Sequence, residues 1–226
     1  MLFKGFFRAF LMVALAALSA EQVNAGVLYD NLAQPSGGSD TVSSIGSGYG
    51  PLADSFSTDA SGAFLSHVTL SLQSNVAHPV SGGNFIVSLL SDAGGATSPG
   101  SFLTVLGSMS DSQLSTSLQN YDFALSTPYQ LSPNTRYWIQ ISSGSGGDTS
   151  AEWSYSSNAS GTGITGEYFA NSGGSYSISD PDYTPYQMAV FTSAAPVVPE
   201  PSAIVLAAIG VVGLGAGRAI RHRRAS

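Results

Sequence analysis

Cysteine is absent from all 226 residues of the chain. Without thiols the protein can form no disulfide, no thiolate zinc site and no cysteine nucleophile. We therefore expect its stability to come from burial of apolar side chains and from backbone hydrogen bonds.

Basic residues are also scarce, and they are unevenly distributed. Six of the seven lie near the two ends of the chain: Lys4, Arg8, Arg218, Arg221, Arg223 and Arg224. Residues 26–198 keep only Arg136 and twelve of the fourteen acidic residues, because Glu21 and Glu200 fall outside. One basic against twelve acidic groups gives this body a net charge of −11 with histidine neutral. Such a charge excludes nucleic acid and anionic membrane as favoured partners.

The first 25 residues have the three parts of a secretory signal peptide. Lys4 and Arg8 form the basic region, residues 9–20 are apolar apart from one serine, and small residues precede the bond between Ala25 and Gly26. This pattern predicts export by the Sec machinery and cleavage after Ala25. The alternative is an N-terminal anchor, but the apolar run is shorter than the ~20 residues that span a bilayer.

The last 30 residues combine a proline motif, an apolar run and a basic tail. The run 203–217 has 15 residues without a charge, short of the ~18 expected of a stable transmembrane helix. The arginines that follow should stay on the cytoplasmic side, leaving the body outside. The pattern predicts transient association with the inner membrane, and a permanent tail anchor is the open alternative.

This end of the chain resembles the PEP-CTERM sorting domain of Gram-negative bacteria over residues 198–224. The residues that carry the resemblance are Pro199, Glu200 and Pro201, followed by the short apolar helix and the cluster Arg218, Arg221, Arg223 and Arg224. The resemblance implies recognition by an exosortase, cleavage near the Pro-Glu-Pro motif, and delivery to the cell surface or extracellular matrix.

The body between the two ends is rich in Ser, Thr and Gly, and its apolar residues alternate. Val68, Leu70 and Leu72 share one side of a predicted strand; Tyr137, Ile139 and Ile141 share one side of another. About ten such segments, separated by Gly, Ser and Pro turns, predict an all-β fold. We expect an antiparallel two-sheet β-sandwich of jelly-roll type, flanked by an N-terminal signal helix and a C-terminal transmembrane-like sorting helix. The predicted domains are 1–25, 26–195 and 196–226.

The body also resembles the choice-of-anchor domain family, type R, over about residues 27–192. The resemblance rests on short motifs in order: Leu28–Asn31, Asp54–Phe56, Ser91-Asp92 with Gly94-Gly95 and Pro99-Gly100, Thr135–Ile139, Trp153–Tyr155 and Pro185–Met188. These domains occur with alternative surface-anchoring tails. The resemblance implies no catalytic residues.

Two kinds of binding site can be drawn on the body. Trp138, Trp153 and Tyr155 are candidates for an aromatic platform that stacks on a sugar, although core packing is the favoured role for each of them. Asp92, Asp180 and Asp182 lie in glycine- or proline-containing turns and are candidate ligands for Ca²⁺, with solvated turn aspartates as the alternative. Neither aspartate segment has the spacing of a known calcium loop.

The sequence offers only weak candidates for a catalytic site. His67 and His78 are the only histidines of the body, and no nucleophile elbow accompanies them, so structural roles are favoured. Glu152 and Glu167 are its only glutamates and the sole glutamate pair for glycoside hydrolysis. We therefore predict a non-catalytic structural or adhesive domain without a required cofactor. Exopolysaccharide is the predicted partner of such a domain. The alternatives are a secreted polysaccharide-active hydrolase and a calcium-stabilised structural module.

Overall fold

Two six-stranded antiparallel sheets form the body of the protein in a computed structural model, which describes residues 26–44, 50–75, 83–94, 98–144, 148–171, 177–179 and 184–194. The first sheet consists of β1 (Val27–Asp30), β2 (Ser36–Ser43), β4 (Ala63–Ser74), β7 (Gln119–Leu131), β9 (Asp148–Ser156) and β12 (Met188–Ser193). The second consists of β3 (Leu52–Ser57), β5 (Asn84–Asp92), β6 (Pro99–Ser110), β8 (Arg136–Ser143), β10 (Phe169–Asn171) and β11 (Ser177–Ser179).

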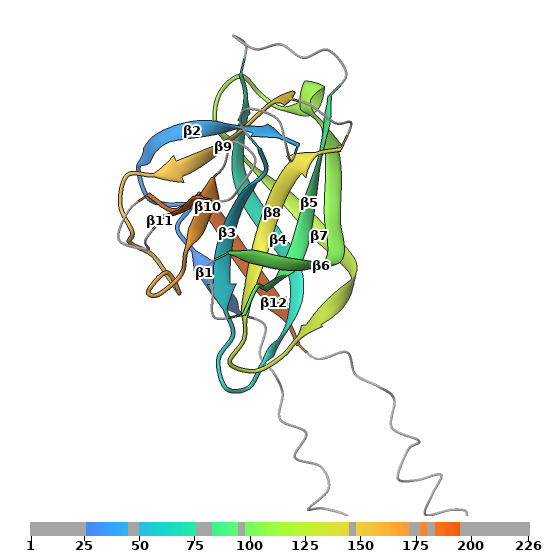
Figure 1. Ribbon diagram of the computed structural model, residues 1–226, viewed down its shortest axis with the longest axis vertical. Helices are drawn as coiled ribbons and strands as arrows, with labels where there is room; N and C mark the ends of the chain where they lie inside the picture. The colour runs from blue at the N-terminus through green and yellow to red at the C-terminus, as the bar shows by residue number, and fades with distance from the viewer. Residues whose placement is uncertain are drawn as a thin grey trace, which may run out of the picture. The chain divides into compact units, whose positions relative to one another are not determined.

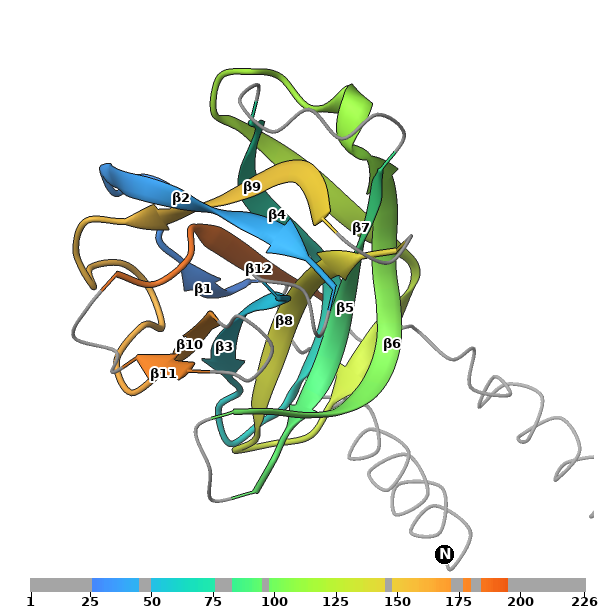
Figure 2. The same ribbon diagram turned by 45° about the horizontal axis from the view of Figure 1, so that its top comes forward.

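The two sheets stack face to face, as Figures 1 and 2 show. The first has the order β1-β12-β4-β9-β2, with β7 paired on β4, and the second has the order β11-β10-β3-β8-β5-β6. The one helical turn in the described ranges is the 3₁₀ segment η1 (Asp111–Gln113). The predicted all-β class with two antiparallel sheets is therefore confirmed.

The core lies between the sheets, and the alternation seen in the sequence builds it. Val68, Leu70 and Leu72 of β4 are fully buried and belong to the same core cluster as the inward side chains of β8 from the second sheet. Those inward side chains are Tyr137, Ile139 and Ile141, as predicted. Trp138 points to the other face of β8, where it joins a smaller cluster with Ala53, Leu90 and Ala170. Burial on this scale supplies the stability that a chain without disulfides requires.

The first and last strands of the described body, β1 and β12, lie side by side. Val27 of β1 pairs with Phe191 of β12. Just before them, Gly26 accepts a 2.8 Å hydrogen bond from the Thr192 backbone and donates one of 2.9 Å to the Thr192 hydroxyl. A compact unit spans Val23–Ala195. Because every described strand and both core clusters fall inside it, we expect residues 26–195 to fold alone.

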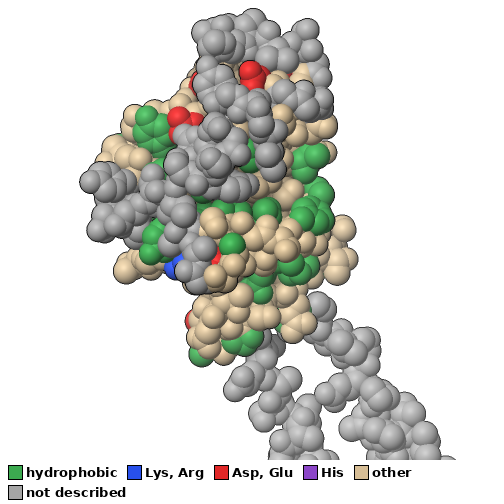
Figure 3. All heavy atoms as spheres, in the orientation of Figure 1, with side chains coloured by type: hydrophobic (Ala, Val, Ile, Leu, Met, Phe, Trp, Pro, Cys, Tyr) green, Lys and Arg blue, Asp and Glu red, His purple; other side chains and the backbone are tan. Residues whose placement is uncertain are grey.

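The surface of the described body is mostly uncharged. On the face drawn in Figure 3, backbone and side chains that are neither hydrophobic nor charged surround small apolar areas, with few carboxylates. This agrees with the low share of charged residues, 9% of the whole chain.

Candidate functional site

A glycine-rich loop between β9 and β10 positions the most unusual polar residues of the body. Its Thr162 forms an isolated bridge with Asp30 of β1. Gly161 and Gly163 have positive φ angles of 148° and 70°, and a Cβ on Gly163 would lie 2.0 Å from the carbonyl oxygen of Leu28. Only glycine permits this approach. The loop therefore runs tightly along β1 and ends at Glu167, beside the second sheet.

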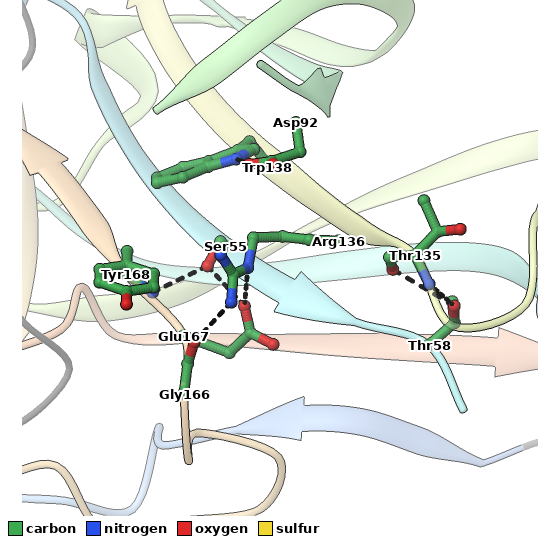
Figure 4. Close-up of polar contacts among 9 residues, drawn as sticks. All are labelled: Ser55, Thr58, Asp92, Thr135, Arg136, Trp138, Gly166, Glu167 and Tyr168. Carbon is green, nitrogen blue, oxygen red and sulfur yellow. Dashed lines mark hydrogen bonds and ion pairs between the residues drawn. The ribbon is translucent and has the colours of Figure 1, made fainter. Parts of the chain in front are cut away.

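Glu167 is bound by two strands of that sheet (Figure 4). Its Oε2 accepts a 2.6 Å hydrogen bond from the Ser55 hydroxyl of β3 and a 3.2 Å ion-pair contact from Nε of Arg136 of β8. The Ser55 hydroxyl in turn accepts a 2.8 Å hydrogen bond from the backbone N–H of Tyr168. The side chain of Glu167 is only 4% exposed. A buried carboxylate is thus neutralised by the only basic residue of the body.

Arg136 completes the contacts around Glu167 and is more exposed to solvent than this carboxylate. Its Nη2 donates a 2.6 Å hydrogen bond to the carbonyl oxygen of Gly166, and its guanidinium lies 4.8 Å from the centre of the Tyr168 ring. The side chain is 27% exposed. The guanidinium therefore fastens the loop to β8 through a carboxylate, a carbonyl and an aromatic face at once.

Asp54 lies on the opposite face of β3, inside the core. Its Oδ2 accepts a 3.3 Å hydrogen bond from the Tyr29 hydroxyl of β1, while its Oδ1 has no hydrogen-bond partner within the described part of the chain. Burial, and secondarily the charge of Glu167, raise the pKa of Asp54 well above its ordinary value. The hydrogen bond from Tyr29 and the backbones of Ser55 and Tyr186 oppose this shift.

The Tyr29 hydroxyl, which donates to Asp54, also has a raised pKa. Burial raises the pKa of its hydroxyl well above the ordinary value, and the neighbouring carboxylate of Asp54 raises it further. Neutral forms of both groups are therefore favoured. Because Asp54 is 0% exposed, a substrate from solvent has no path to it in this conformation. Chemically, the pair is a polar link between the two sheets.

Both tryptophans are buried, so the predicted aromatic platform is wrong in its main residues. Trp138 and Trp153 are 0% exposed. Trp138 donates its indole N–H to Oδ1 of Asp92 at 2.9 Å (Figure 4). Trp153 donates to the carbonyl oxygen of Gln187 at 2.9 Å and stacks on the Tyr186 ring. Tyr155 is only partly buried, but it has no exposed tryptophan beside it. The favoured alternative, core packing, is confirmed for both tryptophans.

The predicted metal ligands are only partly described. Asp92 accepts the indole hydrogen bond of Trp138, whereas Asp180 and Asp182 lie outside the described residues. Among the described residues no group of three or more His, Asp or Glu side chains is placed to hold a metal ion. The calcium hypothesis therefore stays a prediction.

The two glutamates do not form the facing pair that the hydrolase alternative needs. Glu152 lies within β9 on the side opposite Trp153, away from the core. It accepts hydrogen bonds from Ser39 and Gln73 at 2.7 and 2.8 Å, and one from Asn75. Glu167 lies on the outer face of the other sheet with Arg136. Two carboxyl groups on outer faces of opposite sheets cannot act on one glycosidic bond.

The remaining candidates contribute no constellation. The His67 ring stacks on Phe191 with 4.2 Å between centroids, and its Nδ1 lies 3.1 Å from the Ser66 hydroxyl. His78 lies outside the described residues. A shallow, open hollow of about 390 Å³ lies between the start of β4 and the end of β7; it is lined by Ser61, Ala63, Phe64, Gln130, Leu131, Ser132 and Pro133. It contains no charged or catalytic side chain.

The predicted sorting residues can be placed only at their inner borders. Gly26, the first residue after the expected signal cleavage, is paired with Thr192. Ala25, Pro199, Glu200, Pro201 and the four terminal arginines lie outside the described residues. Within the described ranges, no helix has the length and apolar character needed to cross a membrane.

Sequence reasoning missed the cluster of Ser55, Arg136 and Glu167, although it singled out Arg136 and Glu167 separately. The only available signal was that a lone cation in an acidic body needs a carboxylate partner. Neither the scan against protein-family models nor the search of curated proteins found a match to this chain.

Proposed function

We propose that the chain is an exported surface protein that is sorted by an exosortase and delivers a structural or adhesive β-sandwich to the cell surface or extracellular matrix. The order of signals in the sequence carries this proposal. A signal peptide ends at Ala25, and the Pro-Glu-Pro motif starts at Pro199. The described strands begin at Val27 and end at Ser193, so both proposed cleavage sites fall just outside the folded body.

The chemistry of the body favours binding over catalysis. The four buried carboxylates among the described residues are each held by neighbouring groups; they are Asp54, Asp111, Glu152 and Glu167. The surface of the body offers hydroxyl and amide groups, which suit weak hydrogen bonding to a hydrated polysaccharide. The proposal includes a jelly-roll arrangement of the sandwich, a signal helix and a sorting helix.

Mass spectrometry of the protein recovered from a host with an exosortase tests the sorting. We expect a mature N-terminus at Gly26 and loss of the residues beyond about Pro201. Glu200→Ala should block the C-terminal cleavage, whereas Ser202→Ala is the matched control. An intact C-terminus in the surface-delivered wild type would contradict the proposal and favour a permanent tail anchor.

A glycan array probed with residues 26–195 tests the adhesive role. We expect weak, charge-independent binding to neutral polysaccharide. Release of reducing ends from a bound polysaccharide would instead favour the hydrolase alternative. A melting temperature that falls on addition of EGTA would favour the calcium-stabilised module, because a ligand of the native state must raise it.

A further inference from the structure

The hollow between the start of β4 and the end of β7 is bordered by the outer face of the first sheet. Phe64 and Gln130 are direct partners across these two strands, so their side chains share one face. The neighbours of Phe64 in the chain, Ala63 and Leu65, belong to the core cluster between the sheets. Because side chains alternate along a strand, Phe64 and Gln130 point away from the core. Both line the hollow.

Two turns frame the hollow at one end of the sandwich, and hydrogen bonds hold them together (Figure 1). The Thr58 hydroxyl donates a 2.6 Å hydrogen bond to the carbonyl oxygen of Ser132 and accepts one of 3.0 Å from the Thr135 backbone. Figure 4 shows the contact between Thr58 and Thr135. The Asn134 N–H donates to the carbonyl oxygen of Asp59 at 2.8 Å. The walls of the hollow are therefore formed before a ligand arrives, which lowers the entropic cost of binding.

The lining combines apolar rings with hydrogen-bonding groups. The ring of Phe64 is half-buried, and the exposed lining residues are Ser61, Gln130, Ser132 and Pro133. The two serine hydroxyls and the glutamine amide make no side-chain hydrogen bond within the described part of the chain. A sugar ring has apolar C–H faces and a border of hydroxyls. It therefore complements a site with an aromatic ring and several donors and acceptors.

The charge around the hollow indicates which kind of sugar fits. Among the described residues no charged side chain lines it, and Asp59 is the only charged residue of the two turns. The body as a whole has a net charge of −11. A polymer with carboxylate or sulfate groups would be repelled, because the lone cation, Arg136, is already paired with Glu167. The hollow therefore suits a neutral sugar.

The dimensions of the site favour a polymer over a single sugar. The hollow of about 390 Å³ is near the lower limit of small-molecule sites, about 300–1,000 Å³, and suits one or two sugar residues. Further along β4, His67 stacks on Phe191 of β12 with 4.2 Å between ring centroids. Phe64 and His67 each precede a core residue, so both rings lie on the outer face of the sheet. At about 3.3 Å per residue they are about 10 Å apart, a span that an extended sugar chain covers.

We propose that the hollow at Phe64 is the polysaccharide-binding site of this protein, and that its ligand is a neutral polysaccharide. One sugar ring packs against the Phe64 ring, and its hydroxyls exchange hydrogen bonds with Ser61, Gln130 and Ser132. The next sugars of the chain pass over the His67 ring. This inference rests on the adhesive function proposed above and gives that function a site.

Titration of isotope-labelled residues 26–195 with cellohexaose, maltohexaose and mannohexaose, followed by two-dimensional NMR, tests the site. We expect at least one of these neutral hexasaccharides to bind in the millimolar range. It should shift the amide signals of residues 61–67 and 130–132 more than any others. The acidic hexamer of galacturonate should not bind, because the body repels it.

Substitutions in the hollow should weaken this binding. Phe64→Ala should weaken it at least about fivefold, because it removes the ring against which the sugar packs. Gln130→Ala should weaken it about threefold through loss of a hydrogen-bonding group. Phe102→Ala is the matched control, because it removes a phenylalanine that is 60% exposed on β6 of the other sheet and should leave binding unchanged. Circular dichroism establishes that the variants keep the fold, and exposed Gln130 carries the test if Phe64→Ala does not fold.

The outcomes separate this site from the adhesive function as a whole. Largest shifts outside residues 61–67 and 130–132, or an equal loss of binding in Phe102→Ala, overturn the site and leave the adhesive function intact. So does failure of all three neutral hexamers to bind while a polysaccharide on the glycan array is bound. Binding of the galacturonate hexamer alone contradicts a neutral ligand. If the array shows no binding either, the adhesive function itself is wrong, and the site with it.

Discussion

The role of a single residue in this protein depends on which partners the fold places beside it. Arg136 is the only cation of an acidic body, and it is committed to Glu167, Gly166 and Tyr168. Asp54, by contrast, is buried without a cation, and its hydrogen bonds come from the Tyr29 hydroxyl and the backbones of Ser55 and Tyr186. The two carboxylates therefore differ in their surroundings: Glu167 has a cation beside it, whereas burial raises the pKa of Asp54 and favours its neutral form.

Asp54→Asn should stabilise the body at neutral pH by on the order of 1 kcal/mol, because an amide has no charge to desolvate and still accepts from Tyr29. In the wild type the folded pKa of Asp54 is raised. The stability linked to its proton is thus complete below the ordinary value of 3.8 and is lost as pH rises toward the folded pKa. The advantage of the variant should therefore be present at pH 7 and vanish near pH 3.5.

Urea unfolding of both proteins at these two pH values measures the difference. Asp59→Asn is the control, since Asp59 is exposed and asparagine can keep its hydrogen bond from the Ser61 backbone. An equal effect of Asp54→Asn at both pH values would contradict this account.

Arg136→Met should cost about 1–3 kcal/mol, because it leaves the Glu167 carboxylate buried and without a cation. Glu167→Gln in the Arg136→Met background should recover part of the loss, since it removes the unpaired charge. A double-mutant cycle by chemical denaturation gives the coupling energy. Strictly additive effects of the two changes would show that the ion pair does not stabilise the fold.

At the scale of elements, sequence patterns located the strands with strong alternation and missed those without it. The segments expected around Val68 and Tyr137 correspond to β4 and β8. β2 reads Ser-Gly-Gly-Ser-Asp-Thr-Val-Ser and was not predicted, because its glycines and serines are typical of a loop. It is a strand because β9 offers it a hydrogen-bonding edge. β10 and β11 were missed as well, because three residues are too few to show alternation.

In the loop before β10, the conformation requires glycine more strictly at Gly163 than at Gly166. Gly163→Ala should destabilise the body by about 3 kcal/mol or more, because it combines a positive φ with a clash against the Leu28 carbonyl. Gly166→Ala has φ +83° but open space around its Cβ, so it should cost only about 1–2 kcal/mol. Hydrogen exchange at the Asp30 amide, which donates to the Thr162 carbonyl, should speed up in the first variant. A similar loss in both would mean that the close approach to β1 contributes nothing.

At the scale of the whole molecule, stacking of the sheets decides which aromatic residues meet solvent. Trp153 lies in the core between the sheets, and Trp138 lies in the smaller cluster on the other face of β8. A sugar therefore has neither indole to stack on, and any contact with polysaccharide must use other surface groups.

Tryptophan fluorescence reports this burial. We expect folded residues 26–195 to emit at short wavelength, to be quenched little by acrylamide, and to show no spectral change with polysaccharide that binds on the array. Unfolding in urea should restore quenching to that of free tryptophan. Strong quenching in the native state would show that an indole is exposed at the surface, where it could bind a sugar.

The sequence by itself determined the absence of disulfides, the acidic body and the alternating strands, because these follow from composition and from the two-residue period of a strand. Only the tertiary structure decided which face of each strand is covered, since alternation separates two faces without saying what packs on either. It also brought Ser55, Arg136 and Glu167 from distant positions together on the second sheet, and paired β1 with β12 across almost the whole body. Such contacts depend on the topology of the chain, which local patterns do not contain.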